Sequence, residues 1–190
     1  GQQPSASSQN MDGACSTASE FKDLNPESFV VFVGSHVAAL PSETMHLHSF
    51  IDAVCQNEGV YTLRDLLAVT NLKDEFILGR VKGLVFRNFQ KEVIANESSL
   101  IVPSNKLEQD LPGMAWDLLP SFSKYRTAGW HSWSNKSEKE PFAALYTSLG
   151  CPYRCSFCMI NIINRTDQGA DISAADSNKF RHWSPEFIIK

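Results

Sequence analysis

The chain has 190 residues, of which 43% are hydrophobic and 20% are charged, and this composition excludes wholesale disorder. Its formal net charge of −4 argues against a general nucleic-acid binder or a protein held on anionic membranes. No apolar run approaches the roughly 18 residues of a transmembrane helix, and the first twenty residues lack the basic and apolar regions of a signal peptide. The chain begins at Gly1 rather than Met, so we expect a piece of a larger protein.

The N-terminal half predicts alternating strands and helices. Residues 1–28 are expected to be disordered or incomplete, because the first twenty are small and polar. Phe29–Val33 is an apolar block of β-formers, typical of a strand buried on both faces, and residues 50–55 predict a second strand. Pro41 predicts a helix start, and Thr62–Val69 predicts an amphipathic helix with three leucines on one face, Leu63, Leu66 and Leu67. This alternation is typical of a parallel α/β sheet.

Past residue 80 the pattern changes. Residues 83–87 and 92–95 predict a hairpin near a sheet edge. A proline-bearing stretch with scattered aromatics then indicates a linker. Phe142–Thr147 resumes the pattern of a buried strand, and Ser184 followed by Pro185 predicts a capped helix start.

The cysteines carry the strongest chemical signal. Cys151, Cys155 and Cys158 form a C-x3-C-x2-C cluster directly after the last predicted strand. Three soft thiolates on one loop suit an iron–sulfur cluster or zinc, and a fourth position left open suits a catalytic site. The alternatives are a zinc site completed by His131 or His182, and a coincidental grouping of buried cysteines. The spacing disfavours zinc, because zinc sites usually contain C-x2-C pairs.

The whole chain has five cysteines, an odd number that disfavours a disulfide framework. This count indicates a reducing compartment, and we expect the cytoplasm.

The segment Thr147–Cys158, TSLGCPYRCSFC, resembles the cluster loop of radical S-adenosylmethionine (SAM) enzymes. The resemblance implies that the three cysteines bind a [4Fe–4S] cluster whose fourth iron is chelated by the methionine part of SAM. It further implies that reduction of the cluster cleaves SAM to a 5′-deoxyadenosyl radical, with an electron donor such as flavodoxin or ferredoxin. Phe157 would lie against the adenine; the alternative is a plain core aromatic.

The similarity extends upstream, to the branch of this family with an N-terminal cobalamin-binding domain. Gly34, Ser35 and His36 stand where that branch has a Gly-Gly-x-His type loop, and Glu58 and Gly59 match part of its Gly-Glu-Gly-Glu turn. The resemblance implies that these five residues bind the cofactor. Two further segments resemble the hairpin and the connector that lead into the barrel of the family, Val81–Leu84 and Leu111–Leu119.

A physical argument supports the cobalamin hypothesis. Ligands of open α/β sheets bind beyond the carboxyl ends of the strands. Gly34 and Gly59 stand at two such ends, where a missing Cβ lets the backbone approach a flat cofactor; simple tight turns are the alternative. The chain has no Asp-x-His-x-x-Gly stretch, so we do not expect such a histidine to fill the lower axial position of cobalt.

The resemblance predicts an α/β fold in which part of a Rossmann-like cobalamin-binding domain precedes the start of a radical SAM partial (β/α) barrel. It divides the chain into four segments: 1–28, an N-terminal segment; 29–80, the partial cobalamin-binding domain; 81–141, the hairpin and connector; and 142–190, the N-terminal part of the radical SAM domain. The barrel of the family continues well past the cluster loop, so the fragment is expected to be inactive alone.

The implied activity is radical SAM chemistry, with cobalamin for methyl transfer to an unactivated carbon of an unidentified small molecule. Within the enzyme class, the alternatives are ring closure, rearrangement or sulfur insertion of the methylthiotransferase type. Outside that class, they are a zinc-binding interaction module without catalysis and a cobalamin or nucleotide carrier domain with incidental cysteines.

Overall fold

The computed structural model describes residues 10–125, 143, 145–153, 155–158 and 180–189. Contacts within the chain divide it into two compact units. The first comprises residues 1–103 and 150–180, and the second comprises residues 104–149 and 181–190.

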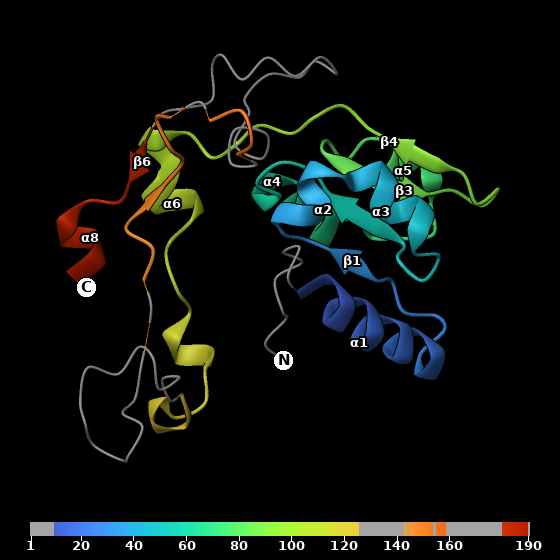
Figure 1. Ribbon diagram of the computed structural model, residues 1–190, viewed down its shortest axis with the longest axis horizontal. Coiled ribbons are helices and arrows are strands. Elements are labelled where there is room, and N and C mark those ends of the chain that lie inside the picture. The colour runs from blue at the N-terminus through green and yellow to red at the C-terminus, as the bar shows by residue number, and fades with distance from the viewer. Residues whose placement is uncertain (1–9, 126–142, 144, 154, 159–179, 190) are drawn as a thin grey trace. The chain divides into compact units, whose positions relative to one another are not determined.

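The first unit is built on a four-stranded mixed sheet (Figure 1) with the order β1-β2-β3-β4. The first two strands are parallel, with Val31 opposite Ala53, whereas β2–β3 and β3–β4 are antiparallel. The hairpin predicted at a sheet edge is therefore confirmed, and it completes this sheet. The strands are β1 Val31–Phe32, β2 Ala53–Cys55, β3 Leu84–Arg87 and β4 Val93–Ala95.

Helices cover both faces of this sheet. Neighbouring residues of a strand point to opposite faces, and Val54 and Ala53 accordingly belong to two separate cores. Val54 packs with side chains from the first three helices, and Ala53 packs with Leu66 and Leu78 from the last two. The α/β class is thus confirmed. The helices are α1 Met11–Leu24, α2 Ser35–Ala39, α3 Pro41–Leu47, α4 Val60–Leu67 and α5 Glu75–Leu78.

Helix α1 corrects, for its own residues, the expectation that residues 1–28 are disordered or incomplete; residues 1–9 lie outside the described residues. It runs alongside β1 in Figure 1, and its Met11 and Ala14 are 8% exposed and belong to the core of Phe32 and Val54. Its apolar stripe is narrow and made largely of small residues, so the polar composition hid it. The Nζ of Lys22 donates to Asp52 Oδ2 and to the Ser28 carbonyl, both at 2.6 Å, and so ties the end of the helix to the sheet.

Helix α4 is confirmed, but its predicted buried face is wrong in part. Leu66 is 3% exposed, whereas Leu67 is 78% exposed and the fully buried neighbour is Thr62. The Thr62 hydroxyl donates to the Lys82 carbonyl at 2.9 Å, which satisfies the polar group that the apolar pattern would have placed in solvent.

The second unit contains short elements only. β5 is displaced from the predicted strand Phe142–Thr147, of which Leu145 and Tyr146 are exposed and Phe142 and Ala144 lie outside the described residues. β5 pairs antiparallel with β6, so the described residues do not show the parallel pairing of a (β/α) barrel. The elements are η2 Ser104–Lys106, α6 Leu107–Asp110, η3 Trp116–Leu118, η4 Phe122–Lys124, β5 Ser148–Leu149, β6 Arg181–His182 and α8 Pro185–Ile189.

The predicted helix start at Pro185 is confirmed by α8. The Phe187 N–H donates to Ser184 Oγ at 3.2 Å, the bond expected of a serine N-cap.

Candidate functional site

The three predicted ligands lie on one loop after β5. Gly150 has a φ of 84°, a left-handed conformation that suits glycine, and the first cysteine follows it directly. The Cys158 N–H donates to the Cys155 carbonyl at 3.0 Å, which closes a turn between the second and third thiols. None of the three forms a disulfide; Cys155 is exposed, and Cys151 and Cys158 are half-buried.

The chemistry of these donors suits a soft metal centre. Three cysteines within eight residues match the local ligands of an iron–sulfur cluster in type and spacing. In the described part of the chain, no group of three or more His, Cys, Asp or Glu side chains lies close enough to hold a metal ion. Of the two histidines of the zinc alternative, His182 lies exposed in β6 and His131 falls outside the described residues.

Phe157, on the same loop, is 90% exposed, so the alternative of a core aromatic is wrong. An exposed aromatic ring beside three thiols is available to stack on a planar ligand.

The predicted glycines follow two neighbouring parallel strands of the first unit's sheet. Because β1 and β2 are parallel, the loops after them leave from the same edge. A Cβ on Gly59, which has a φ of 74°, would lie 3.2 Å from Val33 Cγ1, the residue before Gly34. The structure therefore brings the two loops close together, an arrangement compatible with the cobalamin hypothesis and with the alternative of simple tight turns.

Ser35 and His36 lie in the first turn of α2 rather than in an open loop. The Ala38 N–H donates to the Gly34 carbonyl at 2.9 Å, so the helical hydrogen bonding begins at Gly34 itself. Both side chains are half-buried at the edge where β1 ends.

Glu58, a predicted cofactor-binding residue, has a partner within the fold. Its Oε2 accepts a hydrogen bond from the Val102 N–H at 2.9 Å. The preceding residue, Asn57, donates from Nδ2 to the Ser99 carbonyl at 2.9 Å. No local pattern indicated these bonds, because they join residues 44 and 42 positions apart.

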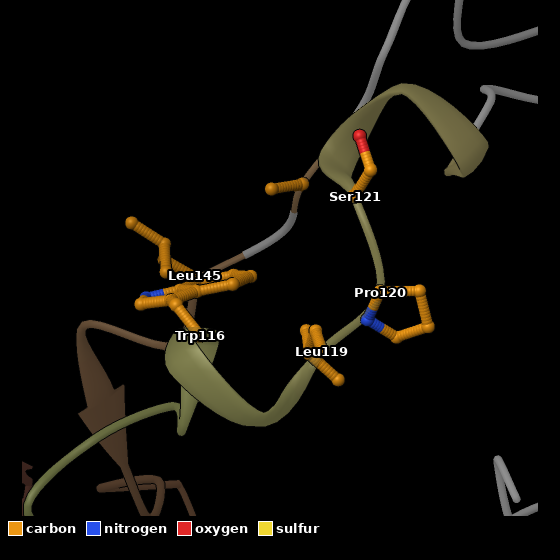
Figure 2. A pocket seen from close by; sticks show the side chains of 6 residues that line it. Trp116, Leu119, Pro120, Ser121 and Leu145 are labelled. Atoms are coloured by element: carbon orange, nitrogen blue, oxygen red, sulfur yellow. The ribbon is translucent and has the colours of Figure 1, made fainter.

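The second unit has a hollow that the sequence did not predict (Figure 2). Its volume is about 520 Å³, and its wall is mostly apolar. Figure 2 shows the indole of Trp116 beside Leu145. The hollow lies partly on the segment that resembles the connector of the family and includes none of the predicted site residues. Its lining residues are Trp116, Leu119, Pro120, Ser121, Ala143 and Leu145.

Among the described residues, no helix has the length and apolar character needed to cross a bilayer.

Comparisons with known proteins identify the class. No family model matches the chain. It is 33% identical over 153 residues to an uncharacterized methyltransferase of Pyrococcus horikoshii, which is 80% of this chain and 30% of that protein. It is 30% identical over 132 residues to 4′-phospho-dehydrooxetanocin synthase of Priestia megaterium, which is 69% of this chain and 15% of that protein.

A third match names the chemistry of a relative. The chain is 28% identical over 138 residues to the cobalamin-dependent radical SAM methyltransferase TokK of Streptomyces tokunonensis, covering 72% of this chain and 18% of that protein. These matches confirm the resemblance drawn from the motifs: the homologues of the chain include a cobalamin-dependent radical SAM methyltransferase and another methyltransferase. It spans between 15% and 30% of the length of these curated relatives.

Proposed function

We propose that the chain is part of a cytoplasmic, cobalamin-dependent radical SAM methyltransferase that acts on an unactivated carbon of a small molecule. The observation that carries this proposal is the loop with three cysteines outside any disulfide, in a chain homologous to a cobalamin-dependent radical SAM methyltransferase. The fragment alone is expected to be inactive, since the relatives are at least three times as long as the matched part.

In this proposal, Cys151, Cys155 and Cys158 hold a [4Fe–4S] cluster. Once bound and reduced by a donor such as flavodoxin or ferredoxin, the cluster supplies the electron for reductive cleavage of SAM. The loop contributes soft anionic sulfur and leaves one iron without a protein ligand. The exposed ring of Phe157 would orient the adenine by stacking.

The edge formed by Gly34 and Gly59 would hold cobalamin, which supplies the methyl group when bound. The missing Cβ of Gly59 allows its turn to lie close to Val33, and the backbone of both loops would face the cofactor. Ser35 and His36 begin a helix at the same edge and offer hydroxyl and imidazole groups for polar contacts.

The proposal is tested by anaerobic reconstitution with iron and sulfide, with zinc in excess as a competitor. We expect about four irons and four sulfides per chain. Cys155→Ala should abolish the bound iron and sulfide, whereas the control Cys15→Ala, which alters a half-buried thiol of α1, should retain both. One zinc per chain without sulfide would contradict the proposal and favour the zinc-binding module. Iron and sulfide that persist in the Cys155→Ala chain would contradict the assignment of this ligand.

A further inference from the structure

Two hydrogen bonds join the turn between β2 and α4 to the segment that follows β4. The Asn57 amide donates to the Ser99 carbonyl, and the Glu58 carboxylate accepts from the Val102 N–H, each at 2.9 Å. These two bonds fix the main chain at both ends of a four-residue stretch, residues 99–102. A charged acceptor makes the second bond one of the stronger kinds of hydrogen bond in a protein.

The residues of this stretch differ in how far they are exposed to solvent. Ser99 and Ile101 are each 7% exposed, and Val102 is fully buried. Leu100, between them, is 52% exposed. The stretch thus holds its main chain against the fold and leaves one large apolar side chain in solvent.

The stretch lies against the turn that includes Gly59, where the proposed function places cobalamin. Because Asn57 and Glu58 directly precede Gly59, the residues that hold the stretch belong to the same turn that would contact the cofactor. Binding costs less conformational entropy when the contacting residues are already held in place than when the ligand must order them.

We propose, on the basis of that function, that Asn57 and Glu58 are positioning residues for the cobalamin site and that Leu100 is the apolar contact they hold in place. Glu58 acts through the Val102 N–H and does not itself contact the cofactor. This assignment changes the role that the motif resemblance implied for Glu58.

The test is titration of the chain with hydroxocobalamin, followed by visible absorbance, with the thermal unfolding midpoint measured for every variant. Glu58→Ala leaves the buried Val102 N–H without this acceptor and should weaken binding about tenfold. Glu58→Gln keeps an oxygen acceptor and should restore the affinity to within about twofold of the wild type. This rescue separates positioning through a hydrogen bond from direct contact through charge.

Leu100→Ala should weaken binding about fivefold by removing apolar surface that the cofactor would cover. Leu67→Ala is its matched control, because Leu67 is 78% exposed and lies at the end of α4 that is remote from Gly59. It should leave the affinity unchanged.

Three results would overturn the inference if the wild-type chain binds hydroxocobalamin. The first is that Glu58→Ala binds as tightly as the wild type, whether or not its unfolding midpoint falls. The others are that Glu58→Gln binds as weakly as Glu58→Ala, or that Leu100→Ala binds as tightly as Leu67→Ala. Failure of the wild-type chain to bind hydroxocobalamin would instead contradict the proposed cobalamin function, and the inference with it.

Discussion

At the scale of single residues, Gly83 shows how closely the first unit is packed near the proposed cofactor edge. Its φ is 74°, and a Cβ there would lie 2.4 Å from Thr62 Oγ1 and 2.8 Å from Ser99 Cβ. Such distances are well inside van der Waals contact, and the neighbours are buried. The glycine is therefore required by both conformation and space.

We expect Gly83→Ala to lower the free energy of unfolding by about 3 kcal/mol, from left-handed strain and overpacking together. Gly13→Ala is the control: apart from the backbone of its own helix and its chain neighbours, nothing lies within 4 Å of its added Cβ, and a glycine-to-alanine change inside a helix stabilises by about 0.5–1 kcal/mol. Urea unfolding of the two variants measures both changes. Equal stability of the two would contradict the close approach at Gly83.

We expect the cysteines to differ in reactivity because they differ in burial. Burial raises the pKa of the Cys55 thiol from its ordinary value of 9.0 to about 12, so this thiol stays protonated near neutral pH. Cys155 is exposed. Since the thiolate is the nucleophile, iodoacetamide at pH 8 under anaerobic conditions should label Cys155 in the metal-free folded chain and leave Cys55 unlabelled.

Mass spectrometry of peptides reads this labelling, and the same reaction in urea should label both cysteines. Rapid labelling of Cys55 in the folded chain would contradict its burial in the sheet.

At the scale of elements, three signals that depend on neighbouring residues alone predicted their elements correctly, whereas the apolar run Phe142–Thr147 did not. The strand within Phe29–Val33, the hairpin and the capped α8 depend on neighbouring residues only. Helix α1 was missed because its stability comes from packing against β1 and from one lysine bridge, and neither is visible in its polar composition. The buried face of α4 was predicted wrongly in part for the same reason. The hydroxyl of the buried Thr62 donates to the carbonyl of Lys82, which is distant in the sequence.

The ion pair between Lys22 and Asp52 is expected to stabilise the packing of α1 on the sheet. Lys22 and Asp52 are only 22% and 28% exposed, and Asp52 Oδ2 also accepts from the Val30 N–H at 2.7 Å. Lys22→Ala should therefore destabilise the chain by about 1 kcal/mol in urea unfolding. Lys73→Ala breaks the exposed pair with Glu27, with side chains 70% and 85% exposed, and should have no measurable effect. Equal effects of the two substitutions would show that α1 is not anchored through Lys22.

At the scale of the whole molecule, the residues of the proposed chemistry follow from local sequence, whereas the contacts between distant segments do not. The sequence by itself determined the donor set, since Cys151, Cys155 and Cys158 lie within eight residues and their chemistry follows from residue type and spacing. It also determined the α/β class, since strand and helix periodicities are properties of short segments.

Only the tertiary structure decided which distant segments meet. It showed that the loops after β1 and β2 lie close together at Gly59, that Glu58 holds Val102, and that Leu100 is left exposed at this turn. The physical reason is that a hydrogen bond across 44 residues, or a contact between two loops, depends on how the strands pair. Strand pairing is settled by the burial of the entire sheet rather than by any pattern within one segment.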